Sequence, residues 1–331
     1  MTRDYPLWSV RLLLALLMAF GSEIILWASP TTYGALDWAV RLLAYPLLAT
    51  LMLDLAQRYR IRDGYDAMVL IAGTSLVQGL LINPRVSWQV LPDSLLTHII
   101  GSQALVLLIV WAVFLAWLRG DRRKYALYQL VAGLWLGMYW GFIMRWQPEL
   151  RDAFVLIPLT DLLFIAGVPF ALIVSFYGLL TASFADDLHA DHLLLTPIGW
   201  GVALMGIIVI FLLQTIQGAI TASAFLLTVA LLALCWLILW LRRDVHETSL
   251  LEQYLPVTRQ FPLWSVLMML VFAGALMLAY RAPLVTDLAF INQLWLMEIG
   301  SFAVGILWLP LVATVIATRA IDRSMRQGWT L

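Results

Sequence analysis

Three acidic residues lie inside long apolar stretches, where acids are rare: Glu23, Asp161 and Glu298. A charged side chain at the centre of a bilayer costs about 3 kcal/mol or more, so an ionisable residue at that depth usually pairs with another charge or marks the pathway of a transported ion or solute. The chemistry that these residue types favour is therefore gating, coupling or substrate contact.

Three further titratable side chains are predicted at a similar depth, nearer to the outer surface. At ~1.5 Å of rise per residue, all six groups fall in the outer half of the membrane. We therefore predict one polar cavity, open to the outside, in which carboxylates and arginines compensate each other's burial. The alternative is a set of separate structural pairs between helices, or arginines that extend toward the surface. The predicted cavity residues are Glu23, Arg41, His98, Arg145, Asp161 and Glu298.

Two loops on the predicted inner side carry closely spaced aspartates. Residues 185–192 read Ala-Asp-Asp-Leu-His-Ala-Asp-His, and residues 62–66 read Arg-Asp-Gly-Tyr-Asp. Aspartates at this spacing can share a Mg²⁺ ion that neutralises a diphosphate. The arrangement resembles the paired aspartate-rich loops of intramembrane prenyltransferases, which would imply an enzyme that handles prenyl groups. It departs from them because the loop at 62–66 lacks the asparagine and the further aspartate of that family, and because histidines flank the aspartates of the loop at 185–192.

The loop at 185–192 also offers ligands for zinc or another transition metal. Histidine and carboxylate are suitable ligands, but four neighbouring residues of one loop rarely complete a tetrahedron. The interpretation that we favour is a solvated acidic turn leading into the next membrane span. The candidate metal ligands are Asp187, His189, Asp191 and His192.

Several function classes lack their sequence signals. The chain has no phosphate-binding P-loop, no dinucleotide-binding glycine pattern and no zinc-protease motif, and the sequence identifies no cofactor. Basic and acidic residues number 20 each, and no long basic run indicates nucleic-acid binding. The single cysteine, Cys235, lies in an apolar run and allows no internal disulfide.

The elements that position these residues are predicted to be membrane helices. Hydrophobic residues make up 63% of the 331 residues and charged residues 12%, about half the charged share of a soluble domain. A helix needs about 20 apolar residues to cross a bilayer. Ten such spans account for most of the chain, so residues 1–331 are expected to form a single integral membrane domain. The predicted spans are 7–28, 36–57, 65–84, 95–118, 124–146, 153–183, 194–216, 218–241, 262–281 and 288–318.

The separation of the seventh span from the eighth, around Gln217-Gly218, has the weakest signal. If these two spans were one element, the orientation of everything after them would invert. The distribution of basic residues favours the ten-span version, because it places fifteen of the 20 lysines and arginines on one side. Basic connections stay cytoplasmic, so both termini are predicted to be cytoplasmic. The five on the other side are Arg41, Arg85, Arg145, Arg151 and Arg281.

Two features are predicted at the inner surface. Ser249 and Glu252 have the spacing of a capping box, which predicts a short helix lying on that surface. Asp54 and Asp66 lie close to arginines of the same interface, and we expect both carboxylates to remain solvated.

Prolines interrupt the sixth predicted span. Pro158 and Pro169 stand on either side of Asp161, and Pro310 follows Glu298 in the tenth span. A proline frees a backbone carbonyl, which must then be satisfied by a cavity, water or a neighbouring helix. Interrupted helices that carry acids near mid-membrane are a feature of secondary transporters.

These patterns predict an all-α bundle of about ten transmembrane helices, inserted as a multi-pass protein in the plasma membrane. The function that they favour is a small-molecule or ion transporter or permease. The first alternative is an integral subunit of a larger membrane complex, whose other members would be its partners besides the lipid bilayer. The second alternative is a membrane-embedded enzyme that handles lipids or prenyl groups.

Overall fold

Helices are the only regular elements in the residues that the computed structural model describes. Nine of these helical runs are long and apolar enough to cross a bilayer, which confirms the predicted all-α, multi-pass architecture. Three segments, η1, η3 and η4, are π-helical, and η6 is a 3₁₀ turn. The described residues are 5–26, 34–88, 90–119, 123–146, 158–184, 189–242, 248–255, 263–281, 299–308 and 312.

The helices follow the predicted spans closely. The tenth predicted span lies largely outside the described residues, and its described part is a short apolar helix, Ile299–Trp308. In chain order the other elements are α1 (Tyr5–Ala19), η1 (Phe20–Leu26), α2 (Ala35–Arg58), α3 (Gly64–Leu81), α4 (Pro84–Ser87), η3 (Leu95–Gln103), α5 (Ala104–Leu118), α6 (Arg123–Trp146), α8 (Leu159–Leu162), η4 (Leu163–Gly167), α9 (Val168–Phe184), η6 (Ala190–Leu193), α10 (Pro197–Ile216), α11 (Ala222–Arg242), α12 (Leu250–Tyr254) and α13 (Leu263–Arg281).

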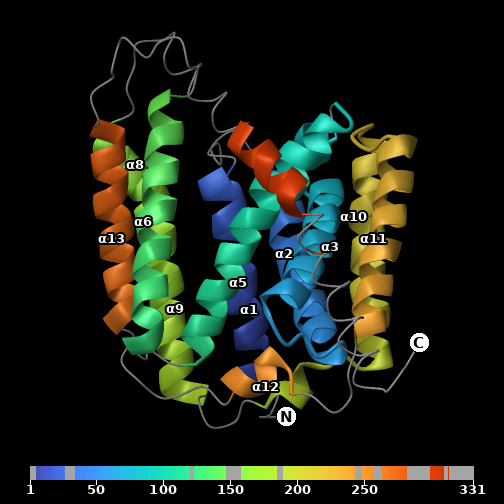
Figure 1. Ribbon diagram of the computed structural model, residues 1–331, viewed down its shortest axis with the longest axis horizontal. Coiled ribbons are helices and arrows are strands. Elements are labelled where there is room, and N and C mark those ends of the chain that lie inside the picture. The colour runs from blue at the N-terminus through green and yellow to red at the C-terminus, as the bar shows by residue number, and fades with distance from the viewer. Residues whose placement is uncertain are drawn as a thin grey trace, which may run out of the picture.

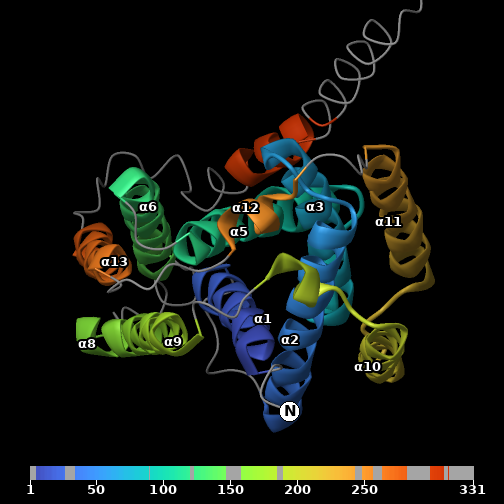
Figure 2. The same ribbon diagram turned by 90° about the horizontal axis from the view of Figure 1, so that it is seen from below.

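The seventh and eighth predicted spans are separate helices, α10 and α11. The chain turns between them at Gly218, whose φ of 66° lies in the left-handed region that glycine adopts without a steric penalty. Both helices lie at one edge of the bundle (Figures 1 and 2), where α10 packs against α2 and α3 and α11 packs against α3. This confirms the span separation on which the predicted charge asymmetry depends.

The bundle has a central part and two flanks (Figures 1 and 2). The centre consists of α1 with η1, α2, α3, and α5 with η3, and between 67% and 72% of the residues in these spans are buried. One flank is the hairpin α10–α11, in which the share is 17%. The other flank contains α6, α13 and the run α8–η4–α9, with 33% to 39% buried. Among the described residues, the first four spans therefore form the best-covered part of the bundle.

Glycines bring α6 and α13 into close parallel contact. Gly133, Gly137 and Gly141 recur every fourth residue along α6 and face the backbone of α13. A Cβ atom at Gly133 would lie 2.7 Å from the carbonyl oxygen of Met268, and one at Gly141 would lie 2.7 Å from that of Leu276. Small residues at this spacing let membrane helices approach until their backbones touch. The α6–α13 pair is thus packed without room for larger side chains.

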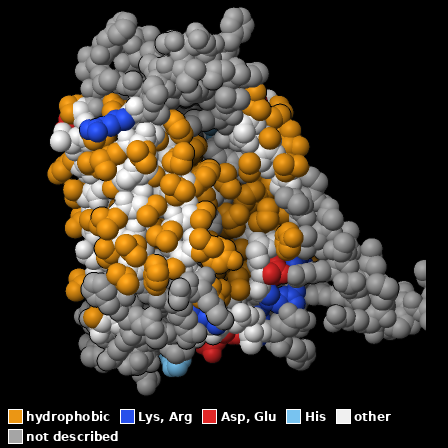
Figure 3. Space-filling model, turned by 60° about the vertical axis from the view of Figure 1, so that its left-hand side comes forward, with side chains coloured by type: hydrophobic (Ala, Val, Ile, Leu, Met, Phe, Trp, Pro, Cys, Tyr) orange, Lys and Arg blue, Asp and Glu red, His pale blue; other side chains and the backbone are white. Residues whose placement is uncertain are grey.

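The surface of the molecule matches a bilayer. On the face shown in Figure 3, apolar side chains cover the middle and charged side chains appear near the two ends. Many large apolar residues on the flanking helices are exposed, including Ile198, Ile216 and Leu278. An outward-facing apolar band of this kind, on helices long enough to cross a bilayer, marks a surface that contacts lipid or another membrane helix. The chain is therefore a multi-pass membrane protein that contacts the bilayer.

The short surface helix predicted from the capping box is α12. Ser249 accepts a hydrogen bond from the backbone N–H of Glu252 at 3.1 Å, and the Glu252 carboxylate accepts one from the Ser249 N–H at 3.0 Å. The helix lies at the end of the bundle where α1 begins (Figure 1). We call this end the N-terminal side and the opposite end the far side.

Candidate functional site

Glu23 lies in the far half of the bundle, on the π-helical segment η1. Only 2% of this residue is exposed. Two residues earlier, Gly21 lets η1 pack directly on α5, because a Cβ atom there would come within 2.9 Å of the side chains of Val106 and Val110. The segment that carries the Glu23 carboxylate is therefore packed tightly against α5 inside the bundle.

Arg41 of α2 is the charged partner of Glu23. Its Nε donates to Glu23 Oε2 at 2.9 Å, and the side chains of the two residues are 7% and 3% exposed. The same guanidinium donates from Nη2 to Asn83 Oδ1 at 2.9 Å and from Nη1 to the carbonyl oxygen of Asp37 at 3.2 Å. The arginine thus joins the first span to its own helix and to the end of the third span.

Neutral polar groups complete the coordination of the carboxylate. Glu23 Oε1 accepts hydrogen bonds from the Tyr45 hydroxyl, from Asn83 Nδ2 at 3.3 Å and from Ser22 Oγ at 3.3 Å. Gln78 Nε2 donates to the Tyr45 hydroxyl at 3.2 Å. These six residues, all buried, form what we call the Glu23 cluster: Ser22, Glu23, Arg41, Tyr45, Gln78 and Asn83.

The Glu23 cluster is an ion pair that its surroundings compensate. A charge moved out of water costs several kcal/mol unless a counter-ion and hydrogen bonds replace the solvent. Here the acid has one cationic and three neutral donors, and the arginine has three acceptors. Separating the pair without replacing one partner would therefore leave an uncompensated buried charge.

Three π-helical segments meet near this cluster. The segment η1 contacts both η3 and η4. All three lie toward the far side of their spans, since η1 ends the first span, η3 begins the fourth and η4 follows α8 near the start of the sixth. Single π-helical turns are rare and frequently mark functional sites. The far half of the bundle is thus the region in which helix geometry is least regular.

Buried polar atoms without a protein hydrogen-bond partner also occur on the elements around η1. Among the described residues these include Oε1 of Gln78 and both amide atoms of Gln103, which ends η3 and is 1% exposed. Ser87 Oγ of α4, next to Gly79, is a further example. Buried polar groups are normally satisfied by protein, water or ligand. The far half thus has hydrogen-bonding capacity that the described side chains do not use.

The other predicted cavity residues are placed less closely together. His98 lies half-buried on η3, in the segment that contacts η1. Asp161 is exposed on α8, and its carboxylate accepts a hydrogen bond from Thr160 at 3.3 Å. Arg145 is in the last turn of α6, with its side chain outside the described part of the chain, and Glu298 also lies outside it. The structure thus joins Glu23 to Arg41 and leaves Asp161 at the surface.

Four members of the cluster were not predicted from the sequence: Ser22, Tyr45, Gln78 and Asn83. A signal for Tyr45 was present, because it follows Arg41 by four residues and so lies on the same helix face. Gln78 and Asn83 lie near the predicted outer end of the third span, at the depth of Arg41. Neutral polar residues at the depth of a buried charge are therefore informative, although a count of charges ignores them.

A second ionic cluster lies on the N-terminal side. Asp54 accepts two hydrogen bonds from Arg58, both at 2.9 Å, and one from the backbone N–H of Leu195 at 2.6 Å. Asp66 lies 2.5 Å from Nε of Arg242. The expectation that Asp54 and Asp66 remain solvated is wrong, because they are 0% and 3% exposed. Leu195, which lies just before α10, and Arg242, the last residue of α11, contribute to these contacts and replace the solvent.

The aspartate-rich loops make structural contacts in their described parts. Asp63 caps α3 by accepting hydrogen bonds from the backbone N–H groups of Tyr65 and Asp66. Asp191 accepts one from Gln57 Nε2 at 3.3 Å, and the exposed rings of His189 and His192 lie 5.6 Å apart. Asp187 is outside the described residues. Within the described residues, no three His, Cys, Asp or Glu side chains gather closely enough to hold a metal ion.

Comparisons of the chain with protein-family models, with curated proteins and with solved structures find no match. Its class therefore follows from its own helices. Nine long apolar helices, a lipid-compatible surface and a buried ion pair at hydrocarbon depth identify a polytopic helical membrane protein.

Proposed function

We propose that the protein is a transporter or permease of the plasma membrane that moves a small polar solute or an ion. The Glu23 cluster would be its gating and coupling centre. The observation that carries the proposal is the buried Glu23–Arg41 pair, placed on a π-helical segment in the far half of the bundle. Intramembrane charges that face a bundle interior typically mark the pathway of an ion or solute.

The contacts of the cluster support a role as a closed gate. The pair joins α2 to η1, while Asn83 extends the contact to the end of α3. A proton or cation on Glu23, or an anionic solute on Arg41, would weaken the attraction between the two and shift the balance toward an open state. A ligand shifts such a balance only through its different affinity for the two states, and each of these ligands competes directly with the closed contact.

The irregular helices around the cluster support the same function. Pro46 follows Tyr45 directly inside α2, and a proline within a helix removes a backbone hydrogen bond. Pro169 comes two residues after η4, the π-helical segment of the sixth span. Discontinuous helices beside charged groups are typical of secondary transporters. His98 and Asp161, on η3 and beside η4, would then act at the entrance to the pathway.

Thiol labelling tests whether the cluster opens to water. In a Cys235→Ser background, which removes the single native cysteine, Ser22→Cys places a near-isosteric thiol beside Glu23. The matched control is Ser265→Cys, a buried serine on α13 outside the cluster. In intact vesicles, a charged, membrane-impermeant methanethiosulfonate should label the cysteine at position 22 and spare that at position 265. Equal resistance of both thiols would identify the cluster as a permanently closed structural pair and overturn the proposal.

The α10–α11 hairpin favours a second candidate, an integral subunit of a larger complex. Only 17% of its spans is buried within the chain, so a partner helix has room to cover it. Crosslinking in native membranes from photoreactive residues at Val202 or Leu226 distinguishes the two candidates. Discrete protein adducts would support the subunit, whereas lipid adducts alone would support a hairpin that faces the bilayer.

A further inference from the structure

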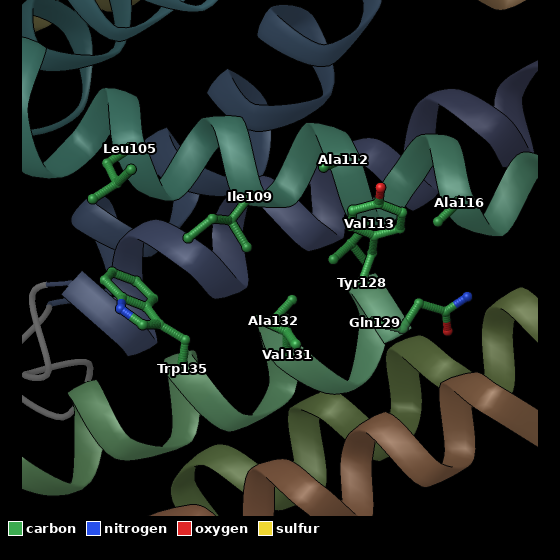
Figure 4. Close-up of a pocket in the computed structure, with 10 residues that line it drawn as sticks. All are labelled: Leu105, Ile109, Ala112, Val113, Ala116, Tyr128, Gln129, Val131, Ala132 and Trp135. Atoms are coloured by element: carbon green, nitrogen blue, oxygen red, sulfur yellow. The ribbon is translucent and has the colours of Figure 1, made fainter. Parts of the chain in front are cut away.

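A lateral crevice separates α5 from α6 within the membrane-spanning part of the bundle. Its volume is about 370 Å³, and its lining is almost wholly apolar. Figure 4 shows Ile109, Ala112 and Ala116 of α5 facing Tyr128, Ala132 and Trp135 of α6 across it. The alanines leave space that larger side chains would fill. This contrasts with the other face of α6, where glycines bring the backbone of α13 into contact.

The crevice has the length of a lipid chain. Between Leu105 and Ala116 it follows α5 for about 17 Å at the rise of an α-helix, and one leaflet of hydrocarbon is about 15 Å deep. A second cavity of about 230 Å³ shares Leu105 and Trp135 with it and continues past Ser102 to the helix Ile299–Trp308. The lining residues Val131 and Tyr128 are 54% and 69% exposed, so the crevice opens toward the surrounding bilayer.

An arginine, Arg119, and two tyrosines lie beyond the N-terminal-side end of the crevice. The connection from α5 to α6 has the sequence Arg-Gly-Asp-Arg-Arg-Lys over residues 119–124, with four basic side chains and one acid. The Arg119 guanidinium lies 5.8 Å from the ring centre of Tyr125 and 5.1 Å from that of Tyr254. Clusters of basic residues beside membrane helices attract anionic lipid headgroups, and tyrosines favour headgroup depth.

A buried amide supplies a polar contact near the same end. Gln129 lines the crevice and is 0% exposed. Its Oε1 lies 3.5 Å from the Ser265 hydroxyl, whereas its Nε2 has no acceptor among the described residues. A buried N–H group without an acceptor is costly. A phospholipid whose chain occupies the crevice would bring ester and phosphate oxygens toward this donor.

We propose that the crevice between α5 and α6 is a binding site for an anionic phospholipid of the leaflet on the N-terminal side. One acyl chain lies between Ala112 and Ala132, Gln129 donates to the ester region, and Arg119 holds the phosphate. The site is distinct from the Glu23 cluster, so it does not depend on the transport proposal.

Native mass spectrometry of the full chain tests this site. The protein is taken from vesicles of phosphatidylcholine with a minor share of phosphatidylglycerol, and the retained lipids are counted. Wild type should retain one phosphatidylglycerol. Ala112→Phe fills the crevice and should lose it, whereas Ala230→Phe adds the same bulk to an exposed position on α11 and should keep it. Retention by Ala112→Phe at the wild-type level would overturn the proposal.

The headgroup contact is tested separately. Arg119→Gln should lower the preference for phosphatidylglycerol over phosphatidylcholine about fivefold, the weight of one basic residue near an anionic lipid surface, while the protein still retains a lipid. An unchanged preference would exclude the anionic headgroup from this end. If Ala112→Phe does not purify as a monodisperse protein, Ala112→Leu replaces it with less added bulk, and its full retention of phosphatidylglycerol would equally contradict the site.

Discussion

The two ionic clusters differ in what surrounds the arginine. The carboxylates of Glu23 and Asp54 are buried to almost the same extent, but the Arg41 side chain is 7% exposed and the Arg58 side chain is 39% exposed. The first pair, together with Asn83, joins three spans at hydrocarbon depth. The second pair holds a connecting segment to the end of one span. Equal burial of an acid therefore does not imply an equal role, because solvent can replace the partner in one cluster and not in the other.

Removing Arg41 should produce the largest effect. Arg41→Leu leaves Glu23 buried without a counter-ion, and breaking a buried pair in this way costs about 3–5 kcal/mol. The free energy of unfolding, measured by SDS titration in bicelles, should fall by that amount. Arg281→Leu is the control, because it removes an exposed arginine that also lies at the far side.

A double variant sharpens this result. In Glu23→Gln with Arg41→Leu, both charges are absent and the glutamine can still accept from Tyr45. Coupled residues are not additive, so the double variant should recover more than half of the loss. Additive losses would show that the two side chains do not act as a pair.

Asp54→Asn should produce the next largest effect, about 1–3 kcal/mol, the range of a lost hydrogen bond to a charged group. The cost is smaller than for Arg41→Leu because the remaining cation, Arg58, reaches solvent and can be hydrated. Exposed charges are screened by salt more than buried ones. The penalty of Asp54→Asn should therefore shrink at high ionic strength, whereas that of Arg41→Leu should not. The same salt dependence for both would remove the distinction between the clusters.

Tyr45→Phe should follow, at about 1–2 kcal/mol. The substitution removes one donor from Glu23 and the acceptor of Gln78 Nε2, while it keeps the ring. Tyr128→Phe is the control, because Tyr128 is 69% exposed on α6. A thermal scan of the two purified variants measures this difference. Equal melting temperatures would show that the Tyr45 hydroxyl does not stabilise the protein.

The sequence could predict the lengths of the helices better than it could predict which side chains meet. Nine of the ten predicted spans and their approximate boundaries were predictable, because bilayer thickness fixes the length of each apolar run. The α12 helix was predictable from the local pattern of Ser249 and Glu252. Which of Arg41, His98 and Arg145 pairs with Glu23 was not, because a helix that is apolar all round has no periodicity to fix its rotation. Depth can be counted from sequence, but the face on which a residue lies is decided by packing.

The burial of Asp54 was missed for a related reason. Its third donor, the backbone N–H of Leu195, comes from a segment 141 residues away, and no local pattern indicates that contact. The glycine spacing at 133, 137 and 141 is the opposite case. It is a local pattern that indicates close helix contact, and it would have predicted a tightly packed face of α6 before any partner was known.

The smallest effect is expected at Asp161, which the sequence grouped with Glu23. Asp161→Asn should change the free energy of unfolding by less than ~0.5 kcal/mol, as surface substitutions usually do, because the carboxylate is exposed and its one described hydrogen bond is to Thr160. A loss as large as that of Arg41→Leu, in the same SDS titration, would mean that Asp161 is buried against a charged partner in the membrane. Asp161 would then belong to the predicted outer-half cavity, and the contrast between a buried Glu23 and an exposed Asp161 would disappear. A small loss of stability together with a loss of transport would instead assign Asp161 to the entrance of the pathway.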